Sequence, residues 1–156
     1  MPTARRSRTI AASVEELWDL MRDPHHLPRW WPRVTRVEDV EEGAFTEVMK
    51  TKKGKWVRAD FDVVREDEDE HVLTWAQRIE GTPFARVLSA AETELRLTPG
   101  EDGTEVSLEL RQTLAGFTPR FGVLAGFSPR MGGRMVRRAA ESTLEQALDG
   151  LERIHG

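Results

Sequence analysis

Residues 10–24 read IAASVEELWDLMRDP, and this short stretch decides the fold that we expect for the chain. Ser13 and Glu16 have the spacing of a capping box, in which the two side chains satisfy unpaired backbone N–H groups at a helix start. The apolar residues around them recur at the spacing of one helix face: Val14, Leu17, Trp18 and Met21. Asp23-Pro24 then ends the helix, because proline lacks a backbone donor and restricts the residue before it. The stretch therefore predicts a short amphipathic helix.

The segments on either side of this helix predict a strand and a second short helix. Residues 3–11 have the mixed alternation of a strand and carry Arg5, Arg6 and Arg8. These arginines resemble a basic nucleic-acid arm, but we favour charges that protect an exposed or edge strand from further pairing. Residues 25–34 read HHLPRWWPRV, and their two prolines favour a helical turn packed onto the domain.

The middle of the chain, about 80 residues, has the pattern of strands separated by turns. We expect strands over residues 34–40, 44–51, 55–64, 71–79, 85–97 and 104–114. The acidic and glycine-proline clusters between them are typical of tight turns, and their short spacing favours antiparallel hairpins over crossover helices. Apolar and polar residues alternate along the strands, as in Val57-Arg58-Ala59-Asp60-Phe61, so we expect one apolar and one wet face.

The C-terminal part contains a local duplication and a long helix. Residues 116–122 (GFTPRFG) recur as residues 126–132 (GFSPRMG), and each copy has the Thr-Pro or Ser-Pro pair of a helix start. We interpret the duplication as a repeated capping solution rather than a repeat architecture. The final helix is predicted over residues 129–154, and one of its sides carries Val136, Ala140, Thr143, Ala147, Leu151 and Ile154.

This helix needs an apolar surface to lie on, and the apolar face of the sheet is the one available. The fold class that we predict is α+β, with residues 1–156 forming a single domain. A curved antiparallel sheet of about seven strands wraps around the long C-terminal helix, and two short helices follow the first strand. A curved sheet and a straight helix cannot touch along their whole lengths, so we expect an internal cavity between them.

Four stretches carry a resemblance to a known family: residues 10–20 with Asp23-Pro24, residues 27–32 (LPRWWP), residues 73–75 (LTW) and residues 103–106 (GTEV). On these stretches the chain resembles the START-like, or SRPBCC, superfamily, which includes birch-pollen-allergen-like and polyketide cyclase/dehydrase-like proteins. The resemblance implies a helix-grip fold with a deep pocket, whose members carry lipids, sterols or hormones, or cyclise aromatic polyketides. Some members act on other proteins, so the resemblance supports the fold more than any one reaction.

Composition and motifs argue against several other classes of protein. The net charge is −4, whereas a duplex-binding domain needs a positive excess, so we expect no nucleic-acid partner. The chain has no cysteine, its four histidines lack metal-ligand spacing, and no phosphate-binding loop occurs, so we predict no metal and no cofactor. No apolar run is long enough to span a membrane and we see no secretory signal, so we expect a cytoplasmic protein. For its oligomeric state we expect a monomer or a homodimer.

The candidate ligand-binding residues are side chains that we expect inside the sandwich. An indole offers a broad apolar wall and one N–H donor, which suits an apolar ligand that carries an oxygen. A glutamine on an apolar strand face is either a structural tie or a hydrogen-bond partner for a ligand. Methionines line adaptable pockets, although they also fill cores. We therefore predict a dry cavity with these ligand-binding residues: Trp31, Phe61, Trp75, Gln77, Gln112, Met131 and Met135.

Three functions remain open from the sequence. The first, which we favour, is binding of a hydrophobic small molecule such as a lipid, an aromatic or a polyketide-like compound. The second is a cyclase or dehydratase acting on an aromatic polyketide-like substrate, which needs an inward-facing ionisable group. Glu47, Glu92 and Glu94 would serve only if local register or a bulge turns them inward, so we assign no catalytic residue. The third is a protein-interaction module that uses residues 117–127 and the arginines Arg130, Arg134, Arg137 and Arg138.

Overall fold

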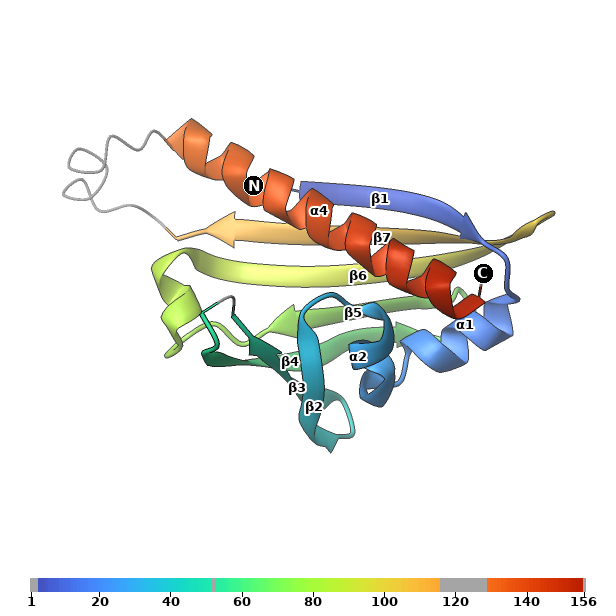
Figure 1. The fold of residues 1–156 in the computed structure, drawn as a ribbon, viewed down its shortest axis with the longest axis horizontal. Helices are drawn as coiled ribbons and strands as arrows, with labels where there is room; N and C mark the ends of the chain where they lie inside the picture. The colour runs from blue at the N-terminus through green and yellow to red at the C-terminus, as the bar shows by residue number, and fades with distance from the viewer. Residues whose placement is uncertain (1–2, 52, 116–128, 156) are drawn as a thin grey trace.

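The computed structural model describes residues 3–51, 53–115 and 129–155, without the side chains of residues 129–133. In chain order its elements are β1 (Thr3–Ile10), α1 (Val14–Met21), the 3-10 turn η1 (Pro24–His26), α2 (Leu27–Trp30), β2 (Val34–Glu41), β3 (Ala44–Lys50), β4 (Trp56–Asp67), β5 (Val72–Gln77), the 3-10 turn η2 (Pro83–Arg86), β6 (Leu88–Gly100), β7 (Gly103–Leu114) and α4 (Pro129–His155) (Figure 1). The duplicated segment lies outside the described residues up to the start of α4. No described helix is both long and apolar enough to cross a membrane.

The strands form one antiparallel sheet in the order β1-β7-β6-β5-β4-β3-β2. Hairpins connect the strands from β2 to β7, as the turn residues predict, and β1 pairs with the last strand rather than with its neighbour in sequence. The helix α4 contacts β1, β7 and α2, so all the helices lie on one face of the curved sheet (Figure 1). The predicted α+β helix-grip fold is confirmed.

The structure confirms the helix start and corrects several strand boundaries, including the end of β4 at Asp67 rather than residue 64 and the end of β6 at Gly100 rather than residue 97. Ser13 Oγ accepts a hydrogen bond from the backbone N–H of Glu16 at 3.2 Å, as the capping box predicts. β5 ends at Gln77 rather than at Ile79, and β6 begins at Leu88 rather than at residue 85. The reason is η2, which begins with Pro83: a fixed φ and a missing N–H suit the first turn of a helix and not a sheet ladder.

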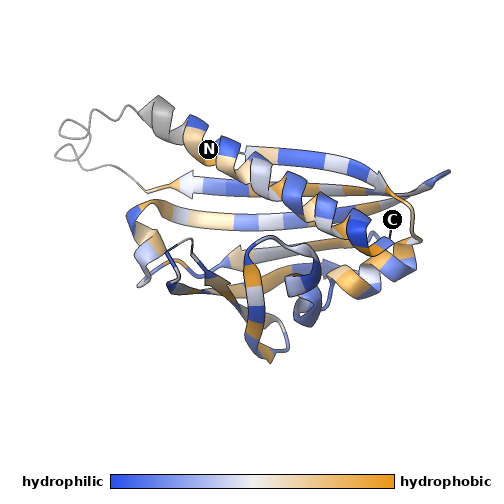
Figure 2. Cartoon of the chain, in the orientation of Figure 1, coloured by the Kyte–Doolittle hydropathy of each residue, from blue (hydrophilic) through white to orange (hydrophobic). Residues whose placement is uncertain are grey.

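The core lies between α4, α1, α2 and the inner face of the sheet. Figure 2 shows hydrophobic and hydrophilic residues alternating along the strands, as expected for a sheet with one buried face. Fully buried side chains from the strands and from the C-terminal half of α4 meet there, among them Leu95, Val106, Leu108, Leu144, Leu148 and Leu151. This half of α4 therefore packs tightly on the sheet.

The basic residues of β1 lie on an edge strand, as predicted. Arg6 reaches α4 and pairs with Glu141 at 2.7 Å, and Arg8 pairs with Asp149 at 2.8 Å. Arg5 points to the other side and pairs with Glu109 of β7. The arginines thus fasten α4 to the sheet edge through ion pairs, a role that the alternation alone did not predict.

Candidate ligand-binding site

A groove of about 800 Å³ opens between the inner face of the sheet and the N-terminal half of α4. This volume lies in the range of about 300–1,000 Å³ that is usual for small-molecule pockets. Its walls come from four parts of the chain, and most of the side chains are apolar. The lining residues are Trp56, Val57 and Arg58 of β4; Pro83, Phe84, Val87 and Leu88 of η2 and the start of β6; Leu110 and Gln112 of β7; and Val136, Ala139, Ala140 and Thr143 of α4.

The groove exists because α4 and the sheet separate towards the start of the helix. Leu144 and Leu148 are completely buried, whereas Val136 is only partly buried and Ala139 is exposed. The helix presents small side chains to the groove, including Ala139 and Ala140, so they leave the space open rather than fill it. This arrangement agrees with the expectation that a straight helix and a curved sheet cannot close on each other along their whole lengths.

Large apolar side chains stand exposed at the mouth of the groove. Trp56 is 52% exposed and Val87 is 55% exposed, and both line the groove. The Trp56 ring forms cation–π contacts with two side chains. The Arg36 guanidinium carbon lies 5.2 Å and Lys50 Nζ lies 5.5 Å from the ring centroid. An apolar ligand that covered Trp56 and Val87 would remove this surface from water.

The structure brings the predicted aromatic residues together, but in the core beside α2 and not in the wall of the groove. Trp31 lies edge-on to Trp75 with ring centroids 6.0 Å apart, and Phe61 is stacked on Phe45 at 5.3 Å. A void beside Trp75 measures only about 10 Å³, which is too small for a ligand. These rings pack mainly against one another, and the aromatic residues that line the groove are Trp56 and Phe84 instead.

The other predicted site residues have different positions. Gln112 lines the groove directly. Gln77 is half-buried, and its Nε2 atom is buried without a hydrogen-bond partner among the described residues. Met135 is 60% exposed and is not among the lining residues, because it lies on a solvent-facing side of α4. The side chain of Met131 lies outside the described part of the structure.

Glu47 of β3 is a buried carboxyl group on the inner face of the sheet. Its side chain is 3% exposed, and β3 pairs with β4 in regular register, so no bulge is needed to turn it inward. Its cross-strand neighbours are the apolar residues Val37 and Ala59. Burial raises the pKa of the Glu47 carboxyl to about 8, and no described residue forms a hydrogen bond or an ion pair with it. From the sequence, Glu47 was a candidate only if local register or a bulge turned its side chain inward.

The two other candidate glutamates lie on the opposite, wet face of the sheet. Glu92 and Glu94 are partly exposed, and both lie close to Arg111, at 3.1 Å and 3.7 Å. They are therefore surface ion pairs and do not face the interior.

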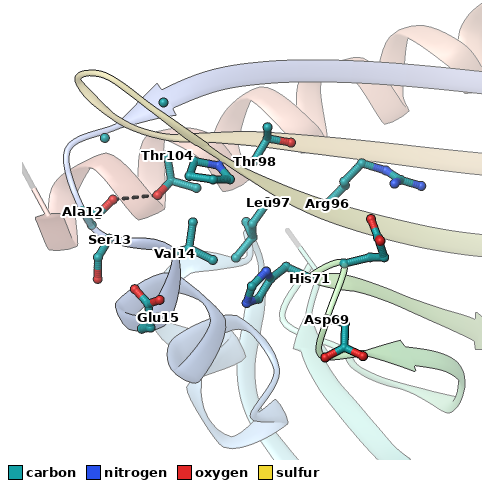
Figure 3. Close-up of a pocket in the computed structure, with 14 residues that line it drawn as sticks. Ala12, Ser13, Val14, Glu15, Asp69, His71, Arg96, Leu97, Thr98 and Thr104 are labelled. Carbon is teal, nitrogen blue, oxygen red and sulfur yellow. Dashed lines mark hydrogen bonds between the residues drawn. The ribbon is translucent and has the colours of Figure 1, made fainter.

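A second pocket, of about 650 Å³, lies at the other end of the sheet, between the start of α1 and two strand turns (Figure 3). Glu15, Asp69 and Arg96 line it, with His71, whose ring lies edge-on to Trp18 at 5.4 Å. Charged side chains and turn backbone do not suit an apolar ligand. Within the described residues no three His, Asp or Glu side chains group as metal ligands.

Sequence reasoning missed most of the residues that line the groove. Part of the signal was present, because Val136, Ala140 and Thr143 lie on the predicted apolar side of the final helix and Val57 on the predicted apolar strand face. The lining residues of η2 were not predicted, because residues 83–86 were assigned from the sequence partly to a turn and partly to the start of a strand.

Known proteins resemble this chain in sequence family and in fold. A family model described as polyketide cyclase/dehydrase and lipid transport matches residues 1–156. The Zhui aromatase/cyclase from a Streptomyces species is 18% identical with a TM-score of 0.73, over 98% of this chain and 92% of that chain. A START superfamily protein from Mycobacterium smegmatis is 17% identical with a TM-score of 0.71, over 98% and 96%.

The chain is also similar to half of a larger protein, the di-domain ARO/CYC StfQ from the steffimycin biosynthetic pathway. The identity is 15% and the TM-score 0.75, over 99% of this chain and 50% of that chain. No protein of curated function matches the chain significantly. Similarity at these identities shows the fold alone, but the family model covers the whole sequence. This protein therefore belongs to the polyketide cyclase/dehydrase and lipid-transport family, and its fold is similar to that of a solved START superfamily protein.

Proposed function

We propose that this protein binds a hydrophobic small molecule, a lipid, an aromatic or a polyketide-like compound, in the groove beneath α4. The observation that carries the proposal is the groove itself, with a volume of about 800 Å³ and mainly apolar walls. Burial of apolar surface contributes about 25 cal/mol per Å², so a ligand of two or three fused rings would gain several kcal/mol there.

Few polar groups in the groove are free to fix the orientation of such a ligand. The Thr143 hydroxyl donates to the backbone carbonyl of Ala139 at 3.0 Å, and Arg58 pairs with Glu38 and Asp39. Gln112 is the remaining polar residue of the described lining, and its amide offers both a donor and an acceptor. A mainly apolar ligand with one or two oxygen atoms fits this distribution best.

The family supports the proposal without choosing the ligand. Its description covers both cyclase/dehydrase activity and lipid transport, and the Zhui protein of similar fold is an aromatase/cyclase. A second candidate function is therefore catalysis on a polyketide-like ligand in the same groove. One observation favours it: Glu47 is a buried carboxyl group whose pKa of about 8 would allow proton transfer near neutral pH.

Replacing Ala139 by Trp is expected to abolish binding of an apolar ligand. Ala139 lines the groove and is exposed, so an indole at this position would occupy the ligand volume without disturbing the core. We expect the affinity for fluorenone, measured by native mass spectrometry, to fall at least tenfold.

The matched control is Arg138→Trp, which adds the same indole to an exposed position on the opposite side of α4. This variant should bind fluorenone like the original protein. Equal binding by the Ala139→Trp variant and the control would show that the ligand does not use this groove.

A further inference from the structure

The inner face of the sheet carries two polar side chains on either side of one small residue. Glu47 of β3 pairs with Ala59 of β4, and Gln77 of β5 pairs with Phe61, the next inward-facing residue of β4. Glu47 and Gln77 thus lie on the two strands that flank β4, at adjacent inward positions. Ala59, whose side chain is a single methyl group, lies between them on β4.

Neither polar group is satisfied by the described residues around it. Glu47 has no hydrogen-bond or ion-pair partner among them, and Gln77 Nε2 is buried without an acceptor. A buried polar group without a partner costs free energy, so its presence on an apolar face requires an explanation. A packing role alone does not explain the two polar side chains, because aliphatic side chains of similar size would fill the same space at a lower cost in free energy.

The groove reaches the residue next to this pair. Val57 lines the groove, and it is the inward-facing residue of β4 that follows Ala59 in the direction away from Phe61. On the other side, Ala91 of β6 pairs with Gln112, which also lines the groove. The groove therefore comes within one inward-facing position of the Glu47 level along β4, and its lining on β7 lies two strands from Gln77 on β5.

We propose that Glu47 and Gln77 form a recognition site for a carbonyl oxygen of the ligand, at the inner end of the groove. The inference rests on the proposed function and names the class of ligand more closely: an apolar, ring-bearing ketone. The amide of Gln77 supplies an N–H donor. A neutral carboxyl group at Glu47 supplies an O–H donor, so both groups offer what a ketone oxygen accepts.

The protonation of Glu47 supports this assignment. Burial raises its pKa to about 8, so at neutral pH most of it is the uncharged acid. The side chains that face it from β2 and β4 are Val37 and Ala59, and Phe45 and Met49 flank it on the inner face of β3, so none of these carries a charge. A hydroxyl donor held in apolar surroundings makes a strong hydrogen bond with a ligand oxygen.

The test compares two ligands of the same shape, fluorene and fluorenone, which differ in one carbonyl oxygen. We expect the unmodified protein at pH 6.5 to bind fluorenone about tenfold more tightly than fluorene, which is the worth of one good buried hydrogen bond. Glu47→Leu should remove this preference while the affinity for fluorene is unchanged. Glu47→Gln keeps a donor and should retain the preference.

The pH profile separates recognition from a structural role. Above the pKa of about 8 the Glu47 carboxyl group loses its proton and can no longer donate a hydrogen bond, so the fluorenone preference should vanish in the unmodified protein and persist in Glu47→Gln. The matched control is Glu92→Leu, on the wet face, which should behave like the unmodified protein. Equal affinity for both ligands in the unmodified protein would overturn the recognition site and leave the proposed function standing. Failure of both ligands to bind would overturn the two together.

Discussion

At pH 9, replacing Glu47 by Gln is expected to raise the free energy of unfolding by about 5 kcal/mol. The physical reason is the burial that raises the pKa of this carboxyl from 4.5 to about 8, because its charged form is poorly solvated in the interior. Each tenfold change in the protonation equilibrium is worth about 1.4 kcal/mol, which gives a total on the order of 5 kcal/mol. Glutamine has nearly the same shape and carries no charge.

The sign of the effect follows from proton binding. Between pH 4.5 and about 8 the folded protein holds a proton on Glu47 that the unfolded chain has lost, so stability falls as the pH rises. The contribution is fully present below pH 4.5 and is lost as the pH passes about 8. The stability difference between Glu47→Gln and the unmodified protein should therefore be small at pH 5, grow steadily, and level off near pH 9.

Urea unfolding at pH 5, 7 and 9 measures this difference. The control is Glu92→Gln, whose carboxylate is solvated and paired with Arg111 at 3.1 Å, and whose effect should be small and nearly independent of pH. A constant difference between Glu47→Gln and the unmodified protein across this range would show that Glu47 is hydrated in the folded state.

Replacing Gly150 by Ala is expected to destabilise the protein by about 2–3 kcal/mol. Alanine is the better helix former by about 1 kcal/mol, so an increase in stability would be expected at an open position of α4. A Cβ atom at Gly150, however, would overlap the backbone oxygen of Trp30 and lie 2.8 Å from its Cα. Backbone cannot rotate away, so α2 would have to move from α4.

A second glycine provides the matched control for this substitution. A Cβ atom at Gly100 would meet its nearest neighbour, the backbone oxygen of Gly103, at 3.6 Å, an ordinary contact. Gly100→Ala should therefore change the free energy of unfolding by less than about 1 kcal/mol. Thermal and urea unfolding of both variants measure the effect. Equal stabilities would mean that α2 and α4 do not approach as closely as the structure shows.

The sequence predicted the architecture well because local signals specify it. The capping box at Ser13 and the strand alternation are each visible within about ten residues, and the periodicity predicted α4. The order of the strands from β2 to β7 follows from their hairpin connections, whereas the pairing of β1 with β7 joins the two ends of the chain and was not predicted. The errors fell at η2, where a proline turn replaces a strand start.

The site was harder to predict because it depends on the shape of the gap between layers. Trp31, Phe61 and Trp75 were correctly expected on the inner side, but periodicity does not tell whether an inward side chain packs on its neighbours or lines a groove. Glu47 shows the same limit: its inward position follows from the pairing of β3 with β4, and its pKa from burial by residues distant in sequence. The close approach of Gly150 to Trp30 is likewise a tertiary contact.

The most direct test of the proposed function is a methyl NMR titration of the labelled protein with fluorenone. We predict saturable shifts of the methyl groups that line the groove, such as those of Val57, Leu110, Val136 and Ala140. Methyl groups beside the second pocket, Val14 and Leu97, should not shift. Shifts confined to Val14 and Leu97, or no saturable shift at any lining methyl group, would contradict the assignment of the groove as the ligand-binding site.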